Sequence, residues 1–222
     1  MSRSLVFLCM TVLPAFLYTT TLCKGATLGA GLTHQSQAPS LHILAFGDSL
    51  TAGYGLPRGQ SFAAKLEQHL LAAGHNVRVT NAGISGDTTA GGSSRLAWSL
   101  EDTADLVILE LGANDALRGI APDIVRENLQ KMINQCLDTG SAVLLCGITA
   151  PINFGPAYKK QFDRIFPELA QKSNIPLYPF FLQGILDNPE LTLDDGLHPN
   201  NQGVETIVTN ILPMVKRILQ LH

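Results

Sequence analysis

Five short apolar runs recur along residues 41–222, separated by more polar segments. They occupy residues 41–46, 77–80, 106–111, 142–148 and 176–181. Each run is too short for a typical helix and lacks a regular alternation of apolar and polar residues. This pattern is typical of strands that are buried on both faces. We therefore expect five strands of one parallel sheet.

The segments between these runs have helical spacing. In SFAAKLEQHLLAAG the apolar residues fall on one stripe, and Gly74 is a typical C-terminal stop. Pro122 suits the first turn of a second helix, which Gly140 ends. A helix at 88–101 is less favoured, because Gly91 and Gly92 lower the helix propensity. Two further helices are expected at residues 158–173 and 203–220.

This alternation of strand and helix predicts right-handed crossovers, and hence a parallel sheet with helices on both faces. The 222 residues, 45% of them hydrophobic, suit one domain with a substantial core, and no internal repeat is visible. In open sheets of this kind functional groups gather at the carboxyl ends of the strands. The chemistry is therefore expected directly after the apolar runs.

The first 25 residues differ from the rest. Arg3 precedes an apolar segment, residues 5–18, which is shorter than the ~20 residues that a spanning helix needs. This layout predicts a secretory signal peptide over residues 1–25, cleaved near Gly25 or Ala26, with an uncleaved anchor or a buried helix as the alternative. Residues 26–40 predict a flexible lead-in, and 41–222 one folded domain. We expect an exported protein, periplasmic or secreted, with no stable membrane span after signal removal.

Charge and cysteine content exclude several functions. The formal net charge is -3 and the basic residues are dispersed, so no nucleic-acid partner is expected. Cys9 and Cys23 would leave with the signal. Cys136 and Cys146 are not at metal-ligand spacing, and we expect buried side chains whose pairing stays open.

Polar clusters follow four of the five runs, as expected for a shared site. Asp48-Ser49 follows the first run, ISGD the second, GAND the third and DDGLHP the fifth. Each cluster alone has an ordinary explanation. Ser49 can cap a helix, Gly86 can serve a turn, Asn114 can bond its own backbone, and His198 can be an exposed loop residue. Together they present complementary chemistry at one edge of the sheet.

That chemistry is nucleophilic catalysis. Asp195 lies three residues before His198 and can accept a proton from one imidazole nitrogen, which leaves the other nitrogen as a base. Ser49 supplies a hydroxyl that needs such a base. The backbone N–H groups of Ser49 and Gly86 and the amide of Asn114 can stabilise an oxyanion. The spacing favours Asp195 over its neighbour Asp194.

The same motifs resemble the four ordered blocks of the SGNH, or GDSL, hydrolases: GDSL, Gly86 within ISGDT, GAND and DGLHP. The resemblance implies a three-layer α/β/α flavodoxin-like sandwich with a parallel five-stranded sheet. It also implies a triad of Ser49, Asp195 and His198, and an oxyanion hole of Ser49, Gly86 and Asn114. LELGAND, ALRG, PINFGPAY and LYPFF are similar to the bacterial exported thioesterase I, arylesterase and lysophospholipase branch.

This branch implies a serine acyl hydrolase that cleaves carboxylic ester or thioester bonds and needs no metal or cofactor. Its substrates would be small acyl esters, thioesters or lysophospholipids. Apolar residues at 148–154, with Leu182, Ile185 and Leu186, predict either an acyl groove or additional core. A carbohydrate O-deacetylase on the same fold is an alternative. So is a non-catalytic flavodoxin-like module with GDSLTAG as a phosphate loop, although the chain lacks the G-x-x-x-x-G-K-[ST] pattern.

Overall fold

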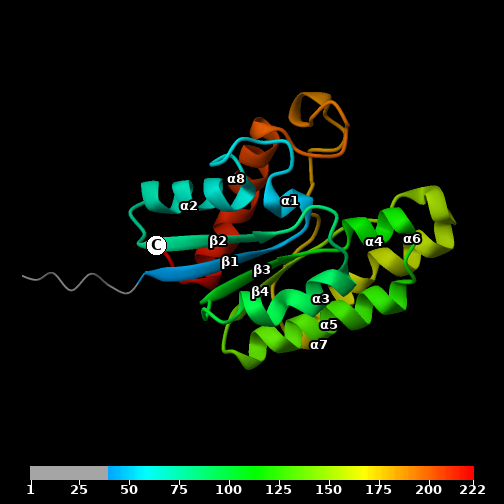
Figure 1. The fold of residues 1–222 in the computed structure, drawn as a ribbon, viewed down its shortest axis with the longest axis horizontal. Helices are drawn as coiled ribbons and strands as arrows, with labels where there is room; N and C mark the ends of the chain where they lie inside the picture. The colour runs from blue at the N-terminus through cyan, green and yellow to red at the C-terminus, as the bar shows by residue number, and fades with distance from the viewer. Residues whose placement is uncertain (1–39) are drawn as a thin grey trace, which may run out of the picture. The chain divides into compact units, whose positions relative to one another are not determined.

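The computed structural model describes residues 40–222 (Figure 1). The signal peptide predicted at 1–25 and nearly all of the lead-in predicted at 26–40 lie outside the described residues. In the part of the chain that the structure describes, no helix is both long and apolar enough to cross a membrane.

A parallel sheet of five strands forms the middle layer, which confirms the predicted fold class. Its order is β2-β1-β3-β4-β5, so the strand order reverses between β1 and β3. In such sheets, the point of reversal opens a crevice at the carboxyl ends of the two strands. The strands are β1 (Leu41–Gly47), β2 (Val77–Gly83), β3 (Leu106–Glu110), β4 (Ala142–Cys146) and β5 (Leu177–Tyr178).

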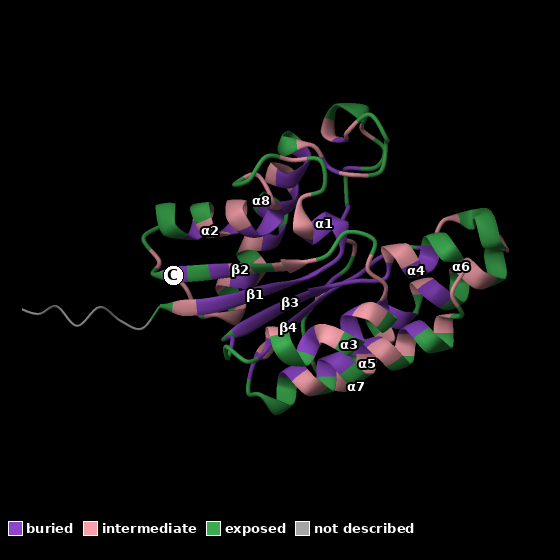
Figure 2. Cartoon of the chain, in the orientation of Figure 1, coloured by how far each residue is buried: buried purple, intermediate pink, exposed green. Residues whose placement is uncertain are grey.

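Burial explains why the strands read as continuous apolar runs. Every residue of β3 is buried, and so is every residue of β4 after Ala142 (Figure 2). The edge strand β2 alternates instead, with Arg78 exposed between two buried valines. β5 has only two residues, whereas the sequence predicted a strand over 176–181. After Tyr178 the regular ladder ends: the N–H of Gly147 donates to Tyr178 O over 2.8 Å, and the N–H of Phe181 donates to Gly147 O over 2.9 Å, so the chain passes Pro179 before it bonds again.

Helices cover both faces of the sheet. α2 (Phe62–Ala72) and α8 (Asn201–Ile218) pack together on one face, and α3 (Thr89–Ser99), α5 (Pro122–Asp138) and α7 (Ile165–Ser173) line the other (Figure 1). α3 forms despite its two glycines. A methyl group on Gly92 would lie 2.3 Å from a Leu111 side-chain carbon, so glycine allows this helix to approach the sheet closely.

The helix predicted over 158–173 is two helices, α6 (Gly155–Asp163) and α7, which meet at Arg164. Pro167 explains the break, because it has no N–H and its ring excludes the carbonyl group four residues earlier.

Two short helices were not predicted. They follow β1 and β3 directly and are α1 (Ser49–Ala52) and α4 (Ala113–Arg118). Two 3-10 helices, η1 (Ile152–Phe154) and η2 (Pro189–Leu191), lie in loops.

The two cysteines of the described residues are both free and buried. Burial raises the pKa of the Cys136 thiol to about 12 and raises that of Cys146 well above its ordinary value. Neither thiol is therefore ionised near neutral pH, and both pack as small hydrophobic side chains.

Candidate active site

Ser49 stands at the point where β1 becomes α1. Asp48 caps this helix, because its Oδ1 accepts a hydrogen bond of 3.0 Å from the backbone N–H of Leu50. A Cβ on Gly47 would lie 2.2 Å from Thr51 Oγ1 and 2.5 Å from the carbonyl oxygen of Glu110. The chain therefore needs glycine there to turn from the strand directly into the helix.

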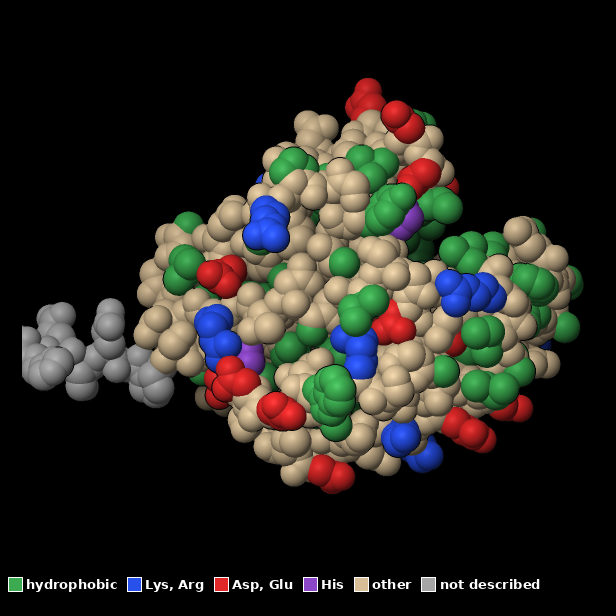
Figure 3. Space-filling model, viewed as in Figure 1, with side chains coloured by type: hydrophobic (Ala, Val, Ile, Leu, Met, Phe, Trp, Pro, Cys, Tyr) green, Lys and Arg blue, Asp and Glu red, His purple; other side chains and the backbone are tan. Residues whose placement is uncertain are grey.

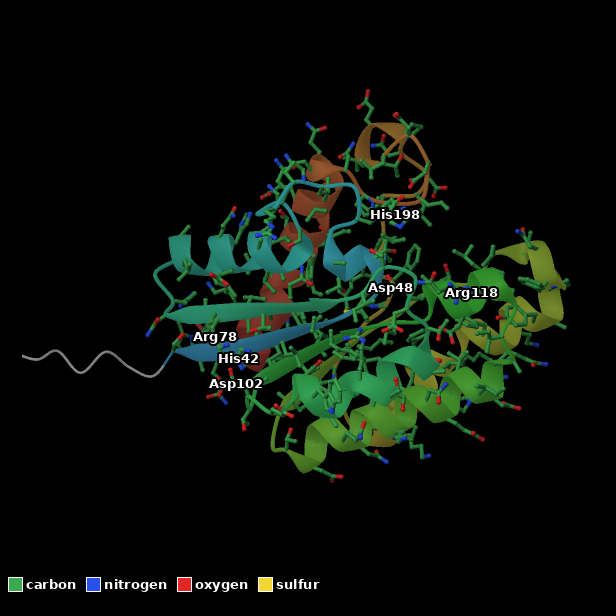
Figure 4. All side chains as sticks on the ribbon, viewed as in Figure 1. His42, Asp48, Arg78, Asp102, Arg118 and His198 are labelled. Atoms are coloured by element: carbon green, nitrogen blue, oxygen red, sulfur yellow. The ribbon has the colours of Figure 1, made fainter. Side chains whose placement is uncertain are left out.

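The structure brings Ser49, His198 and Asp195 together. Ser49 Oγ lies 2.9 Å from His198 Nε2, and His198 Nδ1 lies 2.7 Å from Asp195 Oδ2. Figure 4 shows His198 near Asp48, the residue before Ser49. Serine and histidine are 149 residues apart in the sequence. The arrangement matches a nucleophile, a base and a carboxylate that orients the base.

The Asp195 carboxylate accepts further hydrogen bonds from its own loop. The backbone N–H groups of Leu197 and His198 each donate to Oδ1 over 2.9 Å. These bonds, that of His198 first, lower the pKa of Asp195 to about 2, so the carboxylate is ionised near neutral pH. Asp195 rather than Asp194 bonds the imidazole, as the spacing predicted.

Tyr54 packs against the imidazole of His198. Its ring lies over the imidazole of His198, with centroids 4.5 Å apart and an interplanar angle of 36°. The phenol is half exposed, so it covers the imidazole at the mouth of the site. Our sequence reasoning missed Tyr54. Only its place directly after the GDSLTAG motif points to it.

Gly86 and Asn114 follow β2 and β3, the two strands that flank β1 in the sheet, as expected. Asn114, on α4, donates from Nδ2 to Asp48 Oδ2 over 3.1 Å. Gly86 lies in the loop after β2 with a φ of +82°. The backbone N–H of Ile84 donates to Gly47 O over 3.1 Å, which attaches this loop to the end of β1.

Two buried acids lie beneath the serine. Asp48 and Glu110 are both fully buried. Burial is the main cause that raises the pKa of Asp48 to about 6 and that of Glu110 well above its ordinary value. Glu110 Oε2 accepts a hydrogen bond of 2.8 Å from Thr51 Oγ1 on α1. Glu110 was missed in the sequence because it ends an apolar run.

A cavity of about 260 Å³ opens beside the serine, and Ser49, Asn114 and His198 line it. Gly86 is not among the lining residues. Hydrophobic side chains gather around the histidine at this hollow (Figure 3). Of the apolar cluster noted in the sequence, Leu182 and Leu186 line the cavity, whereas Ile185 belongs to the core. The remaining lining residues are Leu50, Ala113, Ala116, Leu117, Ile148, Thr149, Ala150, Pro151, Phe180 and Leu197.

Comparison with known sequences agrees with this geometry. The model of the GDSL-like Lipase/Acylhydrolase family matches residues 45–205. The arylesterase of Vibrio mimicus is 46% identical over 169 residues, which are 76% of this chain and 84% of the relative. Esterase TesA of Pseudomonas aeruginosa is 40% identical over 85% of this chain and 93% of its own. Thioesterase 1/protease 1/lysophospholipase L1 of Escherichia coli is 36% identical over 71% and 75%.

Comparison with solved structures indicates the same family of enzymes. The crystal structure of TesA superposes with a TM-score of 0.75 at 39% identity and covers 80% of this chain and 99% of its own. The esterase EstA from Pseudoalteromonas sp., inhibited by monoethylphosphonate, gives a TM-score of 0.77 at 32% identity, over 81% and 98%. The chain therefore belongs to the GDSL, or SGNH, family of lipases and acylhydrolases, and it is an ester hydrolase with the fold of that family.

Proposed function

We propose that Ser49 is the nucleophile of an acyl-enzyme mechanism in which His198 is the base and Asp195 orients it. One observation carries this proposal, the continuous chain of hydrogen bonds from Ser49 Oγ through both imidazole nitrogens to Asp195 Oδ2. A serine hydroxyl is a poor nucleophile without such a base.

In the first half-reaction Ser49 Oγ attacks the acyl carbon while His198 Nε2 takes the hydroxyl proton. The imidazolium then gives this proton to the departing alcohol or thiol, and the acyl group stays on Ser49. In the second half-reaction His198 takes a proton from water as the water attacks the acyl carbon, and returns it to Ser49. The ionised carboxylate of Asp195 stabilises the imidazolium in both steps.

The oxyanion of each tetrahedral intermediate is assigned to the N–H groups of Ser49 and Gly86 and to the amide of Asn114. The Asp48 contact supports the role of Asn114. An ionised carboxylate only accepts hydrogen bonds, so Asp48 Oδ2 selects the amide orientation that presents nitrogen. The second N–H of the amide is then available to the cavity that Asn114 lines.

Ser49→Ala tests the mechanism. Turnover of p-nitrophenyl butyrate should fall to the background rate, because the variant lacks the attacking oxygen, while the circular dichroism spectrum stays that of the wild type. The exposed Ser94 on α3 offers a matched control, and Ser94→Ala should keep the wild-type rate. A fluorophosphonate probe should label the wild type and Ser94→Ala but not Ser49→Ala. Unlabelled wild-type protein would favour the binding-module alternative.

We propose that the substrates are esters, thioesters or lysophospholipids with acyl chains of medium or greater length. Two facts support this. The cavity beside Ser49 has a mostly apolar lining, and relatives at 36–46% identity are called arylesterase, esterase and thioesterase/lysophospholipase. Each methylene that enters the cavity would contribute up to about 0.8 kcal/mol, nearly fourfold in binding.

A series of p-nitrophenyl esters tests the substrate class. For acetate, butyrate, octanoate and palmitate below their aggregation limits, kcat/KM should rise over several carbons and then level off where the cavity ends. An optimum at acetate with a steady decline afterwards would remove the acyl groove and favour the carbohydrate O-deacetylase alternative.

We also propose that the protein is exported, to the periplasm or the medium, after removal of residues 1–25. The support is the sequence alone, a basic residue followed by a short apolar segment and small residues. N-terminal sequencing of the protein recovered from the periplasm and medium should give a start near residue 26. Recovery of the full chain from the membrane fraction would support the uncleaved anchor.

A further inference from the structure

Arg95, on α3, binds three separate segments of the chain with one guanidinium group. Its Nε donates to Asp87 Oδ2 over 2.7 Å. Its Nη1 donates to the carbonyl oxygen of Ala82, and its Nη2 to that of Gly47, each over 2.9 Å. The three acceptors belong to the Gly86 loop, the end of β2 and the end of β1. Arg95 therefore joins the end of β1, which leads to Ser49, to the end of β2 and the loop that carries Gly86.

This guanidinium is well enclosed. The Arg95 side chain is 18% exposed and that of Asp87 11%, and the guanidinium carbon lies 4.0 Å from the ring centroid of Phe46. An ion pair with so little solvent around it is weakly screened, and a guanidinium holds several acceptors in a fixed plane. The contact thus sets the positions of its partners more strictly than a surface ion pair would.

The bonds of Arg95 bear on two of the proposed oxyanion donors. Gly47 precedes Ser49 by two residues, and its carbonyl oxygen accepts from both Arg95 and the N–H of Ile84. Asp87 follows Gly86 directly. The loop is thus attached on both sides of Gly86, to Gly47 at Ile84 and to Arg95 at Asp87.

We infer that Arg95 is a positioning residue for the proposed oxyanion hole. In this role Arg95 sets the distance between the backbone N–H groups of Ser49 and Gly86. This inference rests on the proposed function, since it needs both groups to meet the same oxyanion. A role in stability alone predicts a different outcome, namely lower thermal stability with an unchanged kcat in the folded variant.

Arg95→Lys keeps the charge but loses the planar donors that reach three acceptors. At temperatures where circular dichroism shows the variant folded, kcat should fall about 10- to 100-fold with little change in KM, because donors displaced by a fraction of an ångström lose contact mainly in the transition state. Inhibition by phenylboronic acid, which forms a tetrahedral anion on the serine oxygen, should weaken by a similar factor.

Arg78→Lys is the matched control. Arg78 pairs with Asp102 over 2.7 Å at the amino end of the same sheet, far from His198 in Figure 4, with a side chain that is 52% exposed. Its kcat and boronate inhibition should stay those of the wild type. Asp87→Asn, which removes only the ion pair, serves if Arg95→Lys does not fold, and its kcat should fall by a smaller factor.

A folded Arg95→Lys or Asp87→Asn with wild-type kcat and wild-type boronate inhibition would overturn the inference. That result would leave Ser49-dependent turnover intact, and with it the proposed function. Turnover in the wild type that persists in Ser49→Ala would instead overturn the proposed function itself, so the two failures are distinguishable.

Discussion

The carboxylate of Asp48 is shared by the two sides of the site. Its Oδ1 binds the N–H of Leu50 at the start of α1, and its Oδ2 binds the amide of Asn114 on α4. Both bonds lower the pKa of Asp48 against the larger effect of burial, which raises it to about 6. The buried carboxylate of Asp48 therefore connects the turn that carries Ser49 to Asn114, a proposed oxyanion donor.

Asn114→Ala tests this donor. The variant should lower kcat by about 10²–10³ with a smaller effect on KM, because the amide would meet charge that develops only in the transition state. Initial rates across substrate concentrations separate the two parameters. Asn134→Ala, on the exposed side of α5, is a control that should leave both unchanged. A change confined to KM would make Asn114 a ground-state contact.

At the scale of elements, the end of β3 supports the end of β1. Gly47 and Glu110 are partners in the sheet register, and the Glu110 side chain reaches Thr51 on α1. Burial, followed by the charge of Asp48, raises the pKa of Glu110 well above its ordinary value. The folded protein therefore holds this proton more tightly than the unfolded chain does. The stability gained from this tighter proton binding is fully present below pH 4.5, the ordinary pKa of the group. It is lost as the pH rises toward the raised pKa of Glu110 in the folded protein.

Glu110→Gln removes this titration. The free energy of unfolding, measured in urea at pH 5 and pH 8, should decline less between these values in the variant than in the wild type. Asp48 and Glu110 titrate as a coupled pair, since the charge of Asp48 raises the pKa of Glu110, so the difference between the two declines reports the loss of this pair. Glu127→Gln changes an exposed side chain on α5 and should keep the wild-type decline. Equal declines in wild type and Glu110→Gln would mean that Glu110 titrates normally.

The sequence predicted the strands and long helices well, because apolar periodicity reports burial directly. It predicted less where a local feature competes with that signal. Pro167 divides one apolar pattern into two helices. β5 ends after two residues, where the regular ladder with β4 gives way to single hydrogen bonds on either side of Pro179. The candidate site residues were found because each follows an apolar run. Arg95 and Tyr54 were missed, because a side chain that acts from within a helix or across a loop leaves no such mark.

At the scale of the whole molecule, the two halves of the proposed triad come from opposite ends of the described chain. Ser49 follows the first strand, whereas Asp195 and His198 precede the last helix. The loop that carries them is held by the bridge between Thr192 and Pro199 and by the cap of Asn200 on α8. Its position therefore depends on α8 packing against α2.

The separation of 149 residues between serine and histidine has a kinetic consequence. Contacts between distant residues are slow to form, and chains of this length often fold through intermediates with secondary structure but incomplete packing. After dilution from urea, esterase activity should return later than the circular dichroism signal, since β1, β3 and β4 can pair before α8 docks. Simultaneous recovery of both signals would show that the sheet and α8 form in one step. A delay would make enzyme activity the measure of complete refolding.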